Sequence, residues 1–213
     1  MNVAATQSWD ALEPAWRAAF ELAWEAFGAG TIPVGAVVTR GGQIIARGRN
    51  RVFDPSQPPP GEIGGSRVAH AEMNAIAKLG NEDRYPDAVL WTTLEPCAMC
   101  IGAAWLATIG AVRYAGSDVY AGSARLIEAQ LERTDRARSD PLEVDGPLPG
   151  PFGLVGEFLH VAWFVDLRPA HRVTDAFREH VPELVAVAER LRLHERTGAP
   201  LEEALPQVLD ELG

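Results

Sequence analysis

The sequence predicts an α/β protein in which helices cover both faces of a sheet. Apolar residues recur at steps of three and four over residues 10–28, which is the period of an amphipathic helix. Further helices are expected over 70–80 and 97–110. Between the helices, short apolar stretches bounded by glycine or proline are predicted as strands: 32–40, 42–50, 88–95 and 111–117. Strands that alternate with helices in this way indicate a sheet that is buried on both faces.

The first half of the chain carries clear signals for where elements end. Gly41 and Gly42 join the first two strands as a hairpin. Residues 53–66 are dense in proline and glycine and predict a loop, which is either a lid over a neighbouring site or simply mobile. Gly28 and Gly30 end the first helix, whose apolar stripe consists of Leu12, Trp16, Phe20, Ala23 and Phe27.

The character of the chain changes beyond residue 125. Residues 125–213 carry seventeen acidic and ten basic side chains, which accounts for −7 of the formal net charge of −10. Residues 139–153 are predicted as a connector, and 154–167 are apolar throughout and fit either a strand or a helix. The next segment has apolar residues at helical spacing: Phe177, Val181, Leu184, Ala188 and Leu191. Pro182 could break this helix in two.

Composition limits the classes of function. Twenty-nine acidic side chains outnumber nineteen basic ones, which argues against a surface built to hold nucleic-acid phosphates. The N-terminal segment lacks the pattern of a signal peptide, and no apolar run reaches the roughly 18 residues of a membrane span. We therefore expect a cytoplasmic protein with no membrane partner, in a compartment that keeps thiols available as metal ligands.

Cys97 and Cys100 are the only cysteines, and they stand three positions apart directly after Pro96. Such a pair can be a buried structural pair, a thioredoxin-like redox pair or half of a metal site. Proline suits the start of a helix, and residues three apart share a helix face. Both sulfurs would then converge at a helix N-terminus, whose partial positive charge favours thiolates. This geometry suits redox chemistry and metal binding alike.

His70 and Glu72, in the segment VAHAEMNA, favour the metal site. One histidine and two cysteines are three zinc ligands that leave the fourth tetrahedral position to water, as in a catalytic site. We expect His70 in the turn that leads into the helix. Glu72 would reach the same cavity as a carboxylate that is not a ligand and can move the proton of the water. The order H-x-E followed by P-C-x-x-C is the signature of zinc deaminases that act on bases.

With these motifs the chain resembles the cytidine and deoxycytidylate deaminase superfamily, and within it the branch of tRNA adenosine, guanine and bacterial nucleoside deaminases. The matching text lies between about residues 8 and 125: IPVGAVV, GRN, HAE, TLEPCAMCIGA and VRYAGSD. The resemblance implies a cytidine-deaminase-like three-layer α-β-α sandwich with a mixed five-stranded sheet. Residues 1–125 would form a zinc-dependent deaminase domain and 126–213 a mostly helical C-terminal extension. It also implies a homodimer with one zinc ion in each subunit, held by His70, Cys97 and Cys100.

For the substrate, the resemblance implies contacts from the backbone near Ala71 and Pro96 and from the side chain of Asn50, which would bind the base or ribose. Glu72 would act as proton shuttle while zinc-bound hydroxide attacks the carbon that carries the amine and ammonia leaves. Trp105, on the helix that starts at the cysteines, is either a core residue or a stacking partner for the substrate ring.

The expected substrate is a free nucleobase or nucleoside of guanine, cytosine or aminopurine type. The chain departs from the tRNA adenosine deaminases at Leu106, where they usually carry a histidine. They also usually carry basic residues near the C-terminus. The extension of this chain is acidic, which opposes an anionic partner. A tRNA-specific adenosine deaminase that makes inosine is the alternative.

Two interpretations of the C-terminal extension stay open. It either stabilises the domain or an oligomer interface, or it caps the cavity, with Phe152, Phe158 or Trp163 as an apolar wall. The histidines of this region lack metal-ligand spacing and are interpreted as structural or exposed: His160, His171, His180 and His194.

Overall fold

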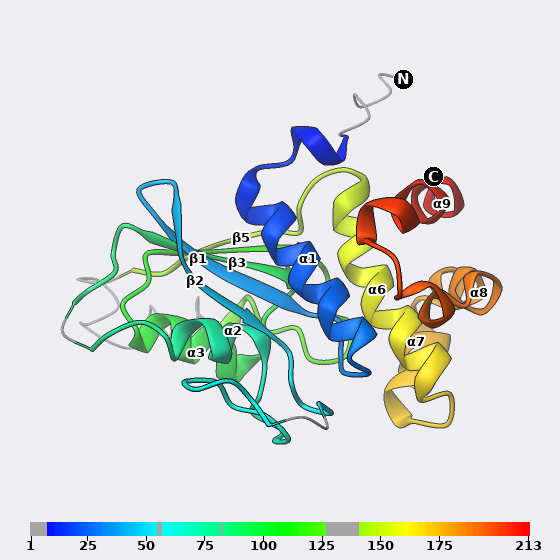
Figure 1. Cartoon of the computed structure of the whole chain (residues 1–213), viewed down its shortest axis with the longest axis horizontal. Coiled ribbons are helices and arrows are strands. Elements are labelled where there is room, and N and C mark those ends of the chain that lie inside the picture. The colour runs from blue at the N-terminus through cyan, green and yellow to red at the C-terminus, as the bar shows by residue number, and fades with distance from the viewer. Residues whose placement is uncertain (1–7, 55–56, 82, 127–140) are drawn as a thin grey trace.

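Five strands form a mixed sheet at the centre of the computed structural model, in the order β2-β1-β3-β4-β5 (Figure 1). β1 (Gly35–Arg40) pairs antiparallel with β2 (Gln43–Arg49) and with β3 (Ala88–Leu94). β4 (Ala111–Gly116) pairs parallel with β3 and with β5 (Glu143–Asp145). The predicted α/β class with a mixed five-stranded sheet is confirmed. The structure describes residues 8–54, 57–81, 83–126 and 141–213.

Two layers of helices cover the sheet (Figure 1). α1 (Pro14–Gly28) and α6 (Pro151–Leu167) lie on one face, and α2 (Ala71–Ile76) and α3 (Ala98–Leu106) lie on the other. Successive residues of a strand pack alternately in these two cores, because side chains alternate between the faces of a sheet. Val37 packs in the core that contains α1 and α6, whereas its neighbour Val38 packs in the core that contains α2 and α3.

Residues 154–167, whose sequence fits a strand or a helix, form most of α6. This helix is buried on almost every side, so its sequence carries no apolar stripe. A Cβ on Gly156 would lie 2.3 Å from the carbonyl oxygen of Thr93, and one on Gly116 would lie 2.1 Å from the backbone nitrogen of Glu157. Glycine at both positions therefore lets the backbone of α6 contact the ends of β3 and β4 directly.

The segment predicted as a connector, 139–153, has a different structure in its described part, while residues 139–140 lie outside the described residues. Its middle forms β5, which extends the sheet beside β4, and Pro151 begins α6. A three-residue strand is too short to show the alternation from which strands are predicted. The C-terminal segment thus supplies one strand and one covering helix of the layered core. The division of the chain near residue 125 stays a prediction.

Further helices pack outside α6: α7 (Arg172–His180), α8 (Pro182–Leu191) and α9 (Leu201–Leu212). α7 ends at His180 and α8 begins at Pro182, so the break at the proline is confirmed. Short 3-10 turns lie at Trp9–Ala11 and Leu193–Arg196. In the part of the chain that the structure describes, no helix combines the length and apolar character required to cross a membrane.

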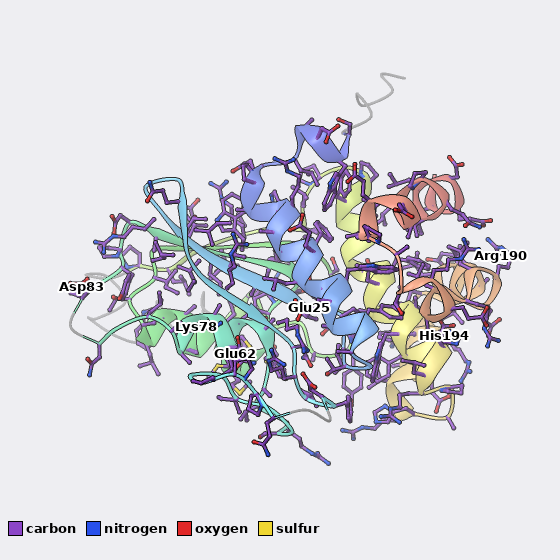
Figure 2. The ribbon with its side chains drawn as sticks, in the orientation of Figure 1. Glu25, Glu62, Lys78, Asp83, Arg190 and His194 are labelled. Atoms are coloured by element: carbon purple, nitrogen blue, oxygen red, sulfur yellow. The ribbon has the colours of Figure 1, made fainter. Side chains whose placement is uncertain are left out.

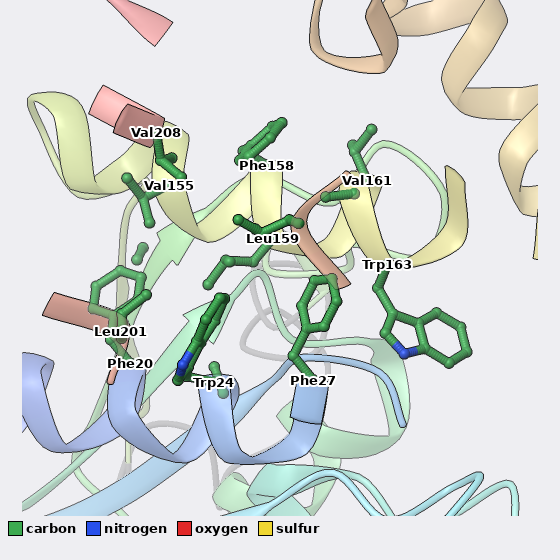
Figure 3. Packing of buried hydrophobic residues seen from close by; sticks show 14 of the residues in the cluster. Phe20, Trp24, Phe27, Val155, Phe158, Leu159, Val161, Trp163, Leu201 and Val208 are labelled. Atoms are coloured by element: carbon green, nitrogen blue, oxygen red, sulfur yellow. The ribbon is translucent and has the colours of Figure 1, made fainter. Parts of the chain in front are cut away.

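The core between α1, α6 and α9 is rich in aromatic rings. Figure 3 shows Phe20, Trp24 and Phe27 of α1 pointing toward α6, where Leu159 meets them, whereas Phe158 points to the opposite side of α6. Adjacent rings on these helices contact each other edge-on or tilted, as Trp24 and Phe27 do at 5.7 Å between ring centres. This packing holds α6 firmly against the sheet and fixes the position of its far end.

Candidate metal centre and active site

His70, Cys97 and Cys100 converge at one end of the sheet. His70 is the N-cap of α2, with extended backbone angles of φ −74° and ψ 156°, so it lies in the turn before the helix as predicted. Cys97 is the N-cap of α3, and Cys100 lies in the first turn of that helix. The His70 Nδ1 atom is 3.7 Å from the Cys97 Sγ atom and 3.6 Å from the Cys100 Sγ atom, and the two sulfurs are 3.7 Å apart.

These three distances fit a tetrahedral zinc ion. With zinc–sulfur bonds of about 2.3 Å and zinc–nitrogen bonds of about 2.0 Å, two sulfurs should lie roughly 3.8 Å apart and a sulfur and a nitrogen roughly 3.5 Å apart. The three donor atoms form a group that could hold a metal ion. The His70 ring also hydrogen-bonds the backbone of Arg67, the kind of outer contact that orients a ligating imidazole.

The protonation of the cysteines suits metal binding. The hydrogen bond between the thiols, together with His70 and against the effect of burial, lowers the pKa of Cys97 to about 4. The same hydrogen bond and burial raise the pKa of Cys100. One thiolate is therefore present at neutral pH without a metal, and a metal ion would displace the proton of the second thiol.

Glu72 lies in the first turn of α2, two residues after His70, and only 3% of it is exposed. Burial raises the pKa of its carboxyl group, although the neighbouring His70 opposes the shift. A carboxyl group with a raised pKa is a better proton acceptor than an ordinary one. Its position beside three zinc-type ligands is the position that a proton shuttle requires.

A cavity of about 710 Å³ opens next to these residues. It lies at the sheet end where β2, β3 and β4 finish and β1 begins. Its polar lining includes Asn50, Arg67, His70, Glu72 and Cys97, and its apolar lining comes from Ile32, Val34, Val52, Phe53 and Leu94. A planar ring with a few polar atoms is the kind of ligand that such a mixed lining can hold.

Asn50 lines this cavity, and its orientation is fixed by hydrogen bonds. Its side-chain oxygen accepts hydrogen bonds from the Thr31 hydroxyl at 2.9 Å and from the Val52 N–H at 3.0 Å. Because both contacts occupy the oxygen, the amide nitrogen is the end left to act as a donor toward the cavity.

A buried ionic network surrounds this asparagine. Arg49 and Arg51 both donate to the Asp54 carboxylate, at 2.7 Å and 2.5 Å, and their side chains are at most 9% exposed. Arg51 also pairs with Glu62, which accepts a second hydrogen bond from Lys78 at 2.6 Å. Figure 2 shows Glu62 and Lys78 side by side at α2. These pairs hold the backbone on both sides of the asparagine in place.

The remaining predicted contacts occupy different places. Ala71 is buried at the start of α2. Pro96 is buried two residues after the end of β3, where its carbonyl oxygen accepts a hydrogen bond from the Ser123 N–H at 3.0 Å. Neither side chain lines the cavity. Trp105 packs against the core of α2 and α3 and is not among the lining residues. The structure therefore favours the core interpretation of Trp105.

The C-terminal helices contribute residues that sequence reasoning missed. His160 and Phe164 of α6 and His171, Arg172 and Val173 at the start of α7 line the cavity. The extension thus forms part of the cavity wall within the same chain. The residues suggested for that wall do not reach it, because they are fully buried in the aromatic core: Phe152, Phe158 and Trp163. The interpretation of His160 and His171 as merely structural or exposed was incomplete, since no local spacing signals a residue brought in by long-range packing.

Comparison with known proteins agrees with this site. A sequence model of the cytidine and deoxycytidylate deaminase zinc-binding region matches residues 10–116. The chain belongs to this family. The matched region contains the whole His/Cys/Cys group and Glu72.

Named members of the family differ in substrate. The chain is 38% identical over 95 residues to a guanine deaminase of Bacillus subtilis, covering 43% of this chain and 55% of the relative. It is also 38% identical over 96 residues to a tRNA-specific adenosine deaminase of Streptococcus pyogenes, covering 44% of this chain and 55% of the relative. The chain spans about half the length of these curated relatives. Two relatives whose names give different substrates are therefore equally similar to this chain.

A solved structure from work on A-to-I editing by tRNA:A34 deaminases superposes with a TM-score of 0.50 at 27% identity. The match covers 67% of this chain and 97% of that chain. It supports the layered fold around the metal-type ligands.

Proposed function

We propose that the protein is a zinc-dependent hydrolytic deaminase of a free nucleobase or nucleoside, of guanine, cytosine or aminopurine type, which releases ammonia. The observation that carries the proposal is the group His70, Cys97 and Cys100 with zinc-type spacing, set beside a buried Glu72 in one cavity. Three protein ligands leave one coordination position open, as a catalytic site needs and a structural site does not.

Glu72 would move the protons. A zinc ion held by the three ligands supplies a water molecule acidic enough to lose its proton near neutral pH. The buried Glu72 carboxylate accepts that proton and passes it to a ring nitrogen of the substrate, which makes the amine-bearing carbon electrophilic. The hydroxide left by the water adds to that carbon. The Glu72 carboxylate then takes the proton of the added hydroxyl group and gives it to the amine, so that the C–N bond breaks, a C=O group forms and ammonia leaves.

Asn50 and the backbone near Ala71 and Pro96 would position the base. The Asn50 nitrogen is the donor end of a fixed amide, so it suits a carbonyl oxygen or an unprotonated ring nitrogen of the substrate. The cavity volume of about 710 Å³ accommodates a base with or without its ribose.

Two features favour a small substrate over a polynucleotide: the cavity wall formed by the C-terminal helices and the net negative charge of the chain. Helices α6 and α7 of the same chain close one side of the cavity, and the chain has a net charge of −10. Both features oppose the approach of an anionic stem-loop. A tRNA-specific adenosine deaminase is the second candidate, since the relative of that name is as similar as the guanine deaminase. The exposed Arg67 and Arg172 at the cavity would be its phosphate contacts.

Ammonia release from the zinc-loaded protein tests the proposal. The panel contains guanine, isoguanine, cytosine, adenine, their nucleosides and a deaminable tRNA, with Glu72→Ala as the inactive control. Turnover of one small base or nucleoside that is lost in the control supports the proposal. Inosine formed only in tRNA would replace the first candidate with the second.

A homodimer is a further part of the proposal and rests on the resemblance of the motifs to the family. A cytoplasmic location is proposed because a reducing compartment keeps the thiols of Cys97 and Cys100 available as metal ligands. Light scattering at several protein concentrations measures the oligomeric state, and a monomer that deaminates at full rate would contradict the homodimer.

A further inference from the structure

Helix α6 presents a polar group to the cavity that the proposed chemistry does not use. Gly156, His160 and Phe164 stand four residues apart and therefore share one face of the helix. Gly156 lies against Thr93 of β3, so this face is directed at the sheet. His160 and Phe164 continue the face past the end of the sheet, where both line the cavity.

His160 is buried yet lacks a hydrogen-bond partner. It is 7% exposed, and its ring meets Phe164 and Phe177 edge-on, with ring centres 5.3 Å and 5.2 Å apart. No described residue forms a hydrogen bond with either nitrogen of the ring. Neither ring nitrogen is among the fully buried polar atoms without a partner in the described residues, so both nitrogens remain accessible. Here the open side of the ring is the cavity that also contains Glu72.

The surroundings keep this imidazole neutral and available. Burial lowers the pKa of His160, with His70 adding to the effect and Asp118 opposing it. A neutral imidazole has one nitrogen that donates and one that accepts a hydrogen bond. The Asp118 carboxylate already accepts hydrogen bonds from the N–H groups of Tyr120 and Ala121, at 2.9 Å and 3.1 Å. These contacts anchor the loop beside His160.

We propose that His160 is a specificity-determining residue that forms a hydrogen bond with the ring of the substrate. The substrate class is then a neutral, planar heterocycle that carries a ring N–H in its six-membered ring in addition to its amine, as the free bases guanine, isoguanine and cytosine do. The six-membered ring of adenine has acceptor nitrogens but no N–H, so adenine cannot donate a hydrogen bond to the accepting nitrogen of the imidazole. A site built to hydrogen-bond its substrate discriminates strongly against such an analogue. This inference rests on the proposed function.

A purely structural role for the ring makes a different prediction. If His160 only fills space between Phe164 and Phe177, phenylalanine should replace it without loss. His160→Phe keeps an aromatic ring there and removes both nitrogens. His160→Gln removes the aromatic ring and restores one donor and one acceptor. The exposed His180 on α7 lies outside the cavity, so His180→Phe is the matched control.

The experiment compares these variants as zinc-loaded proteins on the same panel of bases. We expect His160→Phe to lose roughly tenfold in kcat/KM on the preferred oxo-amino base, which is the weight of one hydrogen bond in a buried site. The loss should fall mainly on KM, and the preference for that base over adenine should shrink by a similar factor. His160→Gln should recover part of the lost kcat/KM and part of the lost base preference. In the control His180→Phe, zinc content and the urea midpoint of unfolding should stay unchanged.

Unchanged kcat/KM and unchanged base preference in His160→Phe would overturn the inference. A wild-type protein that deaminates no base refutes the proposed function first, and calorimetric binding of guanine and cytosine then tests His160 separately. A roughly tenfold weaker affinity in His160→Phe would still support the contact. Equal affinities, or no binding of either base to the wild type, would refute it.

Discussion

The side-chain oxygen of Asn50 accepts a hydrogen bond from the hydroxyl of Thr31 at 2.9 Å. Thr31 is fully buried, and its oxygen in turn accepts a hydrogen bond from the Phe53 N–H at 3.0 Å. The hydroxyl therefore connects the loop before β1 to the segment after β2 and determines which end of the Asn50 amide faces the cavity. Thr31 does not line the cavity, yet its hydroxyl sets the hydrogen-bonding direction of Asn50, which does.

Thr31→Val keeps the shape of the side chain and removes its hydroxyl. Asn50 then loses one of two contacts that orient its amide, and the Phe53 N–H loses its acceptor. We expect kcat/KM to fall roughly tenfold, mainly through KM, because the donor end no longer faces the substrate all the time. Thr31→Ser should restore the rate because it restores the hydroxyl. A Thr31→Val protein with lower stability but unaltered KM would show that Asn50 does not contact the substrate.

The metal-type ligands could be predicted because their geometry is local. His70 and Cys97 each occupy the N-cap of a helix, and Cys100 follows within one turn, so short motifs determine where the donor atoms point. The position of Glu72 follows from the same short segment. The strands of the first half could be predicted for a similar reason, because turns and apolar stretches a few residues long define them.

Other features depend on packing between distant segments. α6 is buried nearly all round and so has no stripe to reveal it as a helix, and β5 is only three residues long. His160 reaches the cavity because Gly156 fits against the sheet four residues earlier, a relationship that is invisible without the sheet. The sequence left Trp105 open between a core residue and a substrate contact, and the direction of its helix face packs it against a core.

Two glycines provide a matched test of how α6 is positioned. A Cβ on Gly156 would lie 2.3 Å from the Thr93 carbonyl oxygen, so Gly156→Ala must push α6 away from β3. We expect a loss of about 1–3 kcal/mol in the free energy of unfolding, together with a lower kcat/KM as His160 shifts. Gly102, inside α3, has no neighbour within 4 Å of such a Cβ, so Gly102→Ala should stabilise by about 0.5–1 kcal/mol. Urea unfolding measures the change in unfolding free energy for both variants. Changes of the same sign would contradict the close contact between Gly156 and Thr93.

Glu62 makes stability depend on pH in the acidic range. Although burial opposes it, hydrogen bonds from Lys78 and Arg51 lower the pKa of Glu62 below its ordinary value of 4.5. On acidification the unfolded chain binds this proton first, so the contribution is fully present above about pH 4.5 and declines as the pH falls through the lower, folded value. The difference in unfolding free energy between wild type and Glu62→Gln should therefore be larger at about pH 7 than at about pH 3.5. Urea unfolding at both values measures it, and a difference that does not change with pH would assign the effect to packing alone.

The fit of the three donor atoms to a tetrahedron can be measured with cobalt in place of zinc. Cobalt bound by His70, Cys97 and Cys100 should give the intense visible absorption of a tetrahedral ion and thiolate-to-metal charge-transfer bands, with one ion for each chain. Cys97→Ser and Cys100→Ser should each weaken the charge-transfer bands and reduce zinc affinity by more than about tenfold. Glu72→Gln is the matched control, because Glu72 is proposed as a proton shuttle and not as a ligand, so its spectrum should stay tetrahedral with both thiolate contributions. A spectrum of an octahedral ion without charge transfer, or one that Glu72→Gln alters as much as the cysteine variants do, would refute the assignment of ligands and shuttle.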